Sequence, residues 1–200
     1  MSAVPEWVFV SHESPILSAK FLLSYLKAPD LIGAVAPSSA FLAKALCRHA
    51  EGAQHLIALG AGTGAVTRHL CEEFPQTSLV VVERDRGMAA ALRRRFGACT
   101  VVADAIEDRA DLFKDIPENS VAVSSLPFRS LPETVAAQIS LLMKQFLLAS
   151  PKRRIVQFTY GRSVPFDAPD PALVWQRREL ILRNFPPAWV WTLQSAANRF

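Results

Sequence analysis

The sequence predicts an α/β domain in which five strand–helix units are followed by a pair of antiparallel strands. Short apolar runs without alternation, typical of strands buried on both faces of a parallel sheet, alternate with helical segments. A glycine-rich turn lies directly after the first of these runs. Near the end of the chain, two strand-like segments are joined by Asn184 to Pro187, which indicates a hairpin.

Length and composition fit one such domain and limit the kind of protein. The chain has 200 residues, of which 50% are hydrophobic, and its formal net charge is +4. No apolar run reaches the roughly 18 residues of a membrane span, and the first residues lack the pattern of a signal peptide. We therefore expect a cytoplasmic protein, soluble or peripherally attached to a membrane. The positive charge favours an anionic partner, either nucleic acid or an anionic lipid surface.

Cysteine and histidine show no metal-binding pattern. Cys47, Cys71 and Cys99 are odd in number and are expected to be buried, reduced thiols. The four histidines form no ligand cluster either, so the sequence predicts no metal site.

The stretch from His55 to Leu70, HLIALGAGTGAVTRHL, is the strongest candidate for a binding site. It is expected to form a buried strand, a tight turn and the start of a helix. Glycine allows backbone conformations closed to other residues and a close approach of a ligand to the backbone. The turn also presents unpaired N–H groups beside a helix N-terminus. These features predict a site for a nucleotide-like cofactor at Gly60, Gly62 and Gly64.

Two carboxylates follow the next two predicted strands. Glu83 stands directly after Ser78 to Val82, where an acid can bind both hydroxyls of a ribose. Asp104 lies at the end of the third short strand, Thr100 to Ala105. Because the carboxyl ends of parallel strands meet at one crevice, both acids and the glycine turn are expected to line one site. Solvated loop acids are the alternative interpretation.

An amphipathic helix is predicted from Ser14 to Ala28, with Ser14 as N-cap and Pro15 at its first position. Aromatic and leucine side chains flanked by lysines are typical of a helix in a headgroup layer, and equally of a helix packed on its own domain. In the first case the membrane contacts would be Leu17, Lys20, Phe21, Tyr25 and Lys27.

A loop of small residues, Leu31 to Ser39, follows this helix and could close over a bound cofactor. Ser38 or Ser39 is then expected to cap a helix that continues through Leu46. We therefore expect residues 1–40 to form the amphipathic helix and a lid loop, and residues 41–200 to form the α/β domain.

The fourth and fifth predicted strands end in segments that would face the same crevice. The fourth, Val121 to Ser124, is followed by Ser125, Leu126, Pro127 and Phe128, which are expected to form a rigid lip over the cofactor. A plain turn is the alternative. The fifth, Arg153 to Phe158, is followed by Thr159, Tyr160 and Gly161.

Together these segments resemble a class I S-adenosylmethionine-dependent methyltransferase, whose Rossmann-like, mostly parallel seven-stranded sheet ends in an antiparallel hairpin. The resemblance implies S-adenosyl-L-methionine as cofactor and S-adenosyl-L-homocysteine as its product. It also implies that Glu83 holds the ribose and that Asp104 reads the adenine. The cofactor-binding residues expected on this basis are Gly60, Ala61, Gly62, Gly64, Glu83, Arg84, Asp104, Ala105 and Ser125. The family usually has an acid two positions before the first glycine, where this sequence has Ala58.

More narrowly, the chain is similar to the small proteobacterial phospholipid N-methyltransferases that convert phosphatidylethanolamine to phosphatidylcholine. The matching pieces include GAVAPSS, LGAGTGAVT, SSLPFRSLP, VQFTYG and NFPPAWVW. The resemblance implies a phospholipid substrate and peripheral attachment to the inner face of the cytoplasmic membrane, with the amphipathic helix on an anionic lipid surface. Nucleic acid is then not expected as a partner. The candidates for contact with the amine are Tyr160, Ser125 and Tyr25, and the further substrate or membrane contacts are Pro127 and Phe128.

Two other functions are compatible with this core. The rRNA adenine dimethyltransferases share it and have a similar lip, but theirs normally begins with Asn or Asp where this sequence has Ser125. Such enzymes also usually carry a helical RNA-binding domain. The other alternative is a methyltransferase fold that only binds a partner, with Ala58 as the trace of a lost activity.

Overall fold

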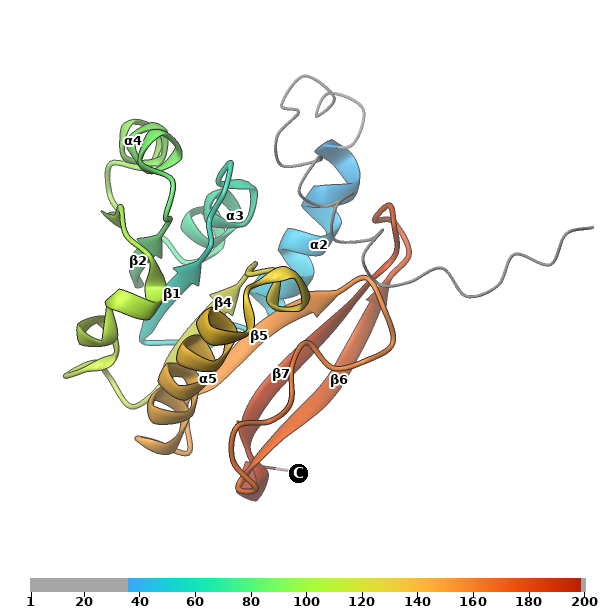
Figure 1. Ribbon diagram of the computed structural model, residues 1–200. Helices are drawn as coiled ribbons and strands as arrows, with labels where there is room; N and C mark the ends of the chain where they lie inside the picture. Colours follow the sequence, from blue (N-terminus) through green and yellow to red (C-terminus); the bar gives the residue numbers. More distant parts are fainter. Residues whose placement is uncertain (1–35, 199–200) are drawn as a thin grey trace, which may run out of the picture.

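The computed structural model describes residues 36–198, which form one seven-stranded sheet with helices on both faces (Figure 1). The strands are β1 (His55–Leu59), β2 (Ser78–Val82), β3 (Thr100–Val102), β4 (Ser120–Ser124), β5 (Arg154–Thr159), β6 (Leu173–Ile181) and β7 (Ala188–Ser195). The predicted amphipathic helix, with Leu17, Lys20, Phe21, Tyr25 and Lys27, lies outside the described residues.

The sheet order is β3-β2-β1-β4-β5-β7-β6. Strands β1 to β5 are parallel, and β7 runs antiparallel to both β5 and β6. This confirms the predicted parallel sheet with a C-terminal hairpin. The strand order reverses between β1 and β4, and crevices for ligands form at such a reversal, outside the carboxyl ends of the strands.

Four α-helices cover the sheet. They are α2 (Ala36–Arg48), α3 (Ala65–Glu73), α4 (Arg86–Arg95) and α5 (Glu133–Leu148). Short 3₁₀ turns span Ile106–Asp108, Ala110–Phe113, Phe128–Ser130 and Ala196–Asn198. Helices α2, α3 and α4 lie on one face and α5 lies on the other (Figure 1). No helix within residues 36–198 is long and apolar enough to cross a membrane.

Two local expectations were wrong. Helix α2 begins at Ala36, so Ser38 and Ser39 lie in its first turn and do not cap it. Proline is compatible with a first turn because the N–H groups there have no partner within the helix, and the sequence APSS therefore continues a helix. The helix expected from Ala110 to Lys114 is a 3₁₀ turn, Ala110–Phe113.

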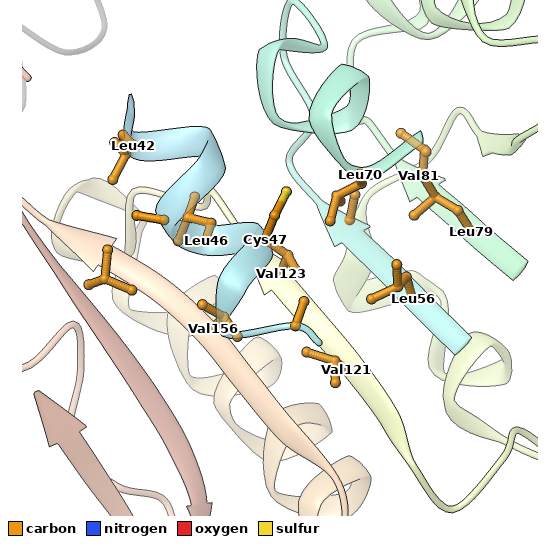
Figure 2. Packing of buried hydrophobic residues seen from close by; sticks show 14 of the residues in the cluster. Leu42, Leu46, Cys47, Leu56, Leu70, Leu79, Val81, Val121, Val123 and Val156 are labelled. Carbon is orange, nitrogen blue, oxygen red and sulfur yellow. The ribbon is translucent and has the colours of Figure 1, made fainter. Parts of the chain in front are cut away.

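Alternate residues along the central strands pack into two apolar layers. On one face, Leu42 and Leu46 of α2 and Leu70 of α3 lie over Val123 and Leu56 (Figure 2). On the other, α5 packs side chains such as Met143 and Phe146 against Ile57 and Ile155. Burying each such side chain contributes about 1.5–3 kcal/mol. The ends of β1, β2 and β4 are therefore held in fixed positions, and the loops that follow them start from a rigid base.

Candidate active site

The glycine turn after β1 lies against the end of β2. The N–H groups of Gly60 and Ala61 both donate to the carbonyl of Val82, at 3.0 and 3.3 Å. Gly60 has a φ of +69°, in the left-handed region that favours glycine. A Cβ added to Gly60 would lie 2.8 Å from Cδ2 of Leu126, in the lip after β4. The turn therefore needs glycine both for its conformation and for its close packing.

The carboxylate of Glu83 points into this turn. Its Oε2 accepts a hydrogen bond from the N–H of Gly62 at 2.7 Å, and its Oε1 accepts one from the N–H of Asp85 at 2.9 Å. Glu83 is only 9% exposed. The structure thus brings together the glycine turn and the acid after β2, two features that the sequence placed at one crevice.

Asp104 lies further from the turn than expected, because β3 ends at Val102 and not at Ala105. Its Oδ1 accepts a hydrogen bond from the N–H of Ala105 at 3.1 Å, and the side chain is about half exposed. The loops after β2 and β3 are nevertheless adjacent, since the N–H of Glu83 donates to the carbonyl of Val102 at 3.0 Å. Arg84 is exposed on the same side, 3.7 Å from the carboxylate of Glu107.

The lip after β4 is held by several hydrogen bonds. The N–H of Ser125 donates to the carbonyl of Leu59 at 2.9 Å, and the N–H of Leu126 donates to the hydroxyl of Ser124 at 3.3 Å. The Nε2 of Gln157, on β5, donates to the carbonyl of Leu126 at 2.9 Å. These contacts fix Ser125 directly beside the glycine turn, where it is half-buried.

Phe128 does not form part of this lip. The side chain is 7% exposed, and its ring stacks on Phe166 with centroids 4.1 Å apart, in the layer on the α5 face. The expectation that Phe128 contacts a substrate or a membrane is therefore corrected, because its ring is used in the core. Pro127, between Leu126 and Phe128, is half-buried.

Tyr160 follows β5 directly and is half-buried. Its ring meets the ring of Phe158 edge-on at 5.5 Å, and both rings pack against the layer on the α2 face. Tyr25, the other predicted aromatic contact for an amine, lies outside the described residues. Ala58 is 3% exposed and packs in the same layer, so no carboxylate enters the crevice at the position where the family usually has one.

Gln157 was not selected from the sequence, although it stands out in the structure. It is 2% exposed, and its Oε1 has no hydrogen-bond partner among the described residues, while its Nε2 holds the lip. A buried polar atom without a partner is costly and needs an explanation. The signal in the sequence is an amide within the otherwise apolar strand IVQFT.

The site offers backbone N–H groups, one buried carboxylate and a rigid lip. Within residues 36–198, no three side chains of His, Cys, Asp or Glu come together as metal ligands. Such a site suits the binding of a group that carries hydroxyls and a positive charge.

Comparisons with known proteins agree with this geometry. No protein-family model matches the chain. The ornithine lipid N-methyltransferase of Singulisphaera acidiphila is 31% identical over 138 residues, which cover 65% of this chain and 72% of that enzyme.

Solved structures show the same fold at low identity. The 1,6-didemethyltoxoflavin-N1-methyltransferase of Burkholderia thailandensis matches with a TM-score of 0.60 and 16% identity, over 94% of this chain and 93% of that chain. The precorrin-6y C5,15-methyltransferase of Geobacter metallireducens matches with a TM-score of 0.56 and 12% identity, over 77% of this chain and 86% of that chain. The 23S rRNA methyltransferase ErmE matches with a TM-score of 0.53 and 17% identity, over 78% of this chain and 68% of that chain.

The sheet order and the glycine turn with its carboxylate define a class I methyltransferase fold. By its identity to the Singulisphaera enzyme, the chain belongs to the S-adenosylmethionine-dependent methyltransferases, in the same family as that lipid N-methyltransferase. S-adenosylmethionine is therefore its cofactor, as the sequence predicted. Family membership also makes it an N-methyltransferase.

Proposed function

We propose that the protein transfers a methyl group from S-adenosylmethionine to the primary amine of a membrane aminolipid. The observation that carries this proposal is the similarity to a lipid N-methyltransferase over 72% of that enzyme's length. Phosphatidylethanolamine and ornithine lipid both present a primary amine on a lipid, so one crevice can serve either of them. The narrower form of the proposal is conversion of phosphatidylethanolamine towards phosphatidylcholine.

The residues of the crevice fit the cofactor. Each oxygen of a carboxylate can accept two hydrogen bonds. One position on each oxygen of Glu83 is used by the N–H groups of Gly62 and Asp85, so one remains on each for the two hydroxyls of a ribose. The remaining cofactor contacts that we propose are Gly60, Ala61, Gly64, Arg84, Asp104, Ala105 and Ser125.

The substrate amine must lose a proton before it can react. The bound cofactor supplies an electrophilic methyl group on a sulfonium, and only a neutral amine has a free electron pair to attack it. An alkylamine with an ordinary pKa of about 10.4 is mostly protonated at neutral pH. Burial beneath the lip would lower the pKa of the amine and favour its neutral form. Ser125 and Tyr160 are our candidates for contact with the amine, together with Tyr25.

The lipid substrate requires contact with a membrane. We assign this contact to residues 1–40, through the predicted helix with Leu17, Phe21 and Tyr25 on its apolar face. Lys20 and Lys27 would face an anionic lipid surface, in keeping with the net charge of +4. The protein would then act at the inner face of the cytoplasmic membrane.

The test is incubation of the purified full-length protein with S-adenosylmethionine labelled on its methyl group and with mixed lipid vesicles. The vesicles contain phosphatidylethanolamine, ornithine lipid or phosphatidylglycerol, which has no amine, and the products are separated by chromatography. We expect label in one or both amine lipids and none in phosphatidylglycerol. Label in phosphatidylethanolamine alone would support the narrower proposal, whereas label in ornithine lipid alone would replace it with the substrate of the relative.

Two outcomes would contradict the proposal. Salt-dependent binding and labelling of RNA, without labelling of lipids, would favour the rRNA methyltransferase alternative. Absence of heat and of thermal stabilisation on adding S-adenosylmethionine would favour a protein that only binds a partner.

The membrane role of the lysines has its own test. Changing Lys20 and Lys27 to Gln should weaken labelling on anionic vesicles but not in detergent micelles, because only the vesicles present a charged surface. An equal loss in both would contradict that role.

A further inference from the structure

A polar hollow of about 710 Å³ lies on the α2 face of the sheet, at the amino end of β5. Its basic lining residues include Arg48 and His49 at the end of α2, Arg154 at the start of β5 and Arg178 on β6. Thr192 and Gln194 of β7 line it as well. Neither the glycine turn nor the lip contributes to it.

Two of the arginines in this hollow have no carboxylate partner among the described residues. Arg154 donates from Nε to the carbonyl of His49 at 2.9 Å and from Nη2 to the carbonyl of Glu51 at 2.5 Å. Arg178 donates from Nε to the hydroxyl of Thr192 at 2.7 Å and from Nη2 to Oε1 of Gln194 at 3.4 Å. All four acceptors are neutral, so both guanidinium groups keep an uncompensated charge.

The single carboxylate beside the hollow is already occupied. Glu179 lies 2.7 Å from Nη2 of Arg48 and 3.0 Å from Nε2 of His49. Three guanidinium groups thus share one carboxylate. Arg177 is not counted here, because its guanidinium stacks on the ring of Trp189, 4.7 Å from the ring centroid.

The cations of the hollow are close enough to affect one another. Burial lowers the pKa of Arg154 and of Arg178, and the charge of Arg178 lowers the pKa of Arg154 further. Burial also lowers the pKa of His49, and the charges of Arg178 and Arg48 oppose the raising effect of Glu179. Partly desolvated cations that repel one another are unfavourable unless an anion joins them. The guanidinium fork matches the oxygens of a phosphate group in particular.

We propose that this hollow binds a phosphate group, at a site separate from the methyl-transfer crevice. Arg154 begins β5 and Thr159 ends it, and at about 3.3 Å per residue the strand separates the two sites by roughly 17 Å. In a phosphatidylethanolamine headgroup only two carbons separate the phosphate ester from the amine. The phosphate in the hollow therefore belongs to a second molecule, either another anionic lipid or a soluble phosphate compound.

The test uses the full-length protein and two probes, inorganic phosphate in solution and vesicles of phosphatidylglycerol. Affinities are measured by calorimetry for phosphate and by flotation for vesicles, for the wild type and for Arg178→Gln and Glu179→Gln. Arg94→Gln, which removes one exposed charge from the last turn of α4, is the matched control. We expect at least tenfold weaker binding of one probe by Arg178→Gln, several-fold tighter binding by Glu179→Gln and no change in Arg94→Gln.

The two probes distinguish the sources of the phosphate. Binding of inorganic phosphate would indicate a soluble ligand, whereas an effect of Arg178→Gln on vesicles alone would indicate a lipid headgroup. The proposal is overturned if neither probe binds the wild type, or if Arg94→Gln weakens binding as much as Arg178→Gln. Should Arg178→Gln fail to fold, the tighter binding expected of Glu179→Gln decides, and equal or weaker binding by that variant would overturn the proposal.

Discussion

Oε2 of Glu83 lies 2.7 Å from the backbone nitrogen of Gly62, so the first residue after β2 directly supports the loop after β1. Its other oxygen accepts from the N–H of Asp85, and the carboxylate of Asp85 in turn caps α4 by accepting from the N–H of Met88 at 2.8 Å. One buried acid therefore shapes the glycine turn and the entry to the next helix, and it also faces the crevice.

Changing Glu83 to Gln should weaken the binding of S-adenosylmethionine by at least tenfold. The amide keeps the size of the side chain but presents an NH₂ group where two acceptor oxygens are needed, and hydrogen bonds to a charged acceptor are worth about 1.5–3 kcal/mol each. The measurement is the Kd by calorimetry. Glu118→Gln, at an exposed acid paired with Lys152, is the control and should bind as the wild type does. An unchanged Kd for Glu83→Gln would remove this residue from the site.

Changing Gln157 to Met should separate stability from activity. Gln157 holds the carbonyl of Leu126 but leaves its own Oε1 without a partner among the described residues. An apolar side chain of similar size loses one hydrogen bond and removes one unsatisfied buried acceptor, and these effects are each about 1 kcal/mol and opposite in sign. We therefore expect a melting temperature close to that of the wild type.

The rate of methyl transfer by Gln157→Met should nevertheless fall by about tenfold or more, because the lip loses the contact that positions Leu126 over Gly60. The rate is measured with saturating cofactor and substrate, so that kcat is separated from KM. A variant that is clearly less stable but fully active would show that Gln157 serves only the packing of the sheet.

Features encoded by neighbouring residues could be predicted from the sequence. The buried strands, the glycine turn and Glu83 each depend on a short segment whose pattern is complete in itself. The end of β3 could not be placed, since whether Asp104 extends the strand depends on pairing with β2, which ends at Val82.

Features made by distant segments were missed. Phe128 is buried because Phe166 comes back over it from the loop before β6, and no local pattern announces that contact. The hollow with Arg48, Arg154 and Arg178 draws on three elements, each with an ordinary arginine. Such charges become a site only when the sheet order brings the elements together.

Changing Gly64 to Ala should lower the free energy of unfolding by about 2 kcal/mol or more. Gly64 has a φ of +83° at the start of α3, and a Cβ there would lie 2.6 Å from Cδ2 of Leu92 and 2.8 Å from the ring of Phe96. The left-handed conformation costs a non-glycine residue about 1–2 kcal/mol, and overpacking adds about 1–3 kcal/mol.

The matched control for Gly64→Ala is Gly97→Ala. A Cβ at Gly97 meets nothing within 4 Å, and Gly97 is not among the glycines with positive φ. Its free energy of unfolding should therefore stay within about 0.5 kcal/mol of the wild type. Both are measured by urea unfolding. Equal losses in the two variants would mean that the effect comes from the composition of the unfolded chain and not from the packing of α3 on α4.

The protein should lose stability between pH 7 and pH 5 because its described histidines are held in their neutral form. Burial is the main cause that lowers the pKa of His49, His55 and His69 below the ordinary 6.5, and the charge of Arg153 adds to the effect at His55. When a base has a lower pKa in the folded state, the unfolded state binds more protons as the pH falls. Its contribution to stability is then fully present above pH 6.5 and is lost as the pH falls towards the pKa of the folded state. Melting temperatures measured from pH 8 to pH 5 should decrease, and His55→Gln should make the decrease shallower. A melting temperature that rises or stays constant over this range would contradict the burial of neutral histidines.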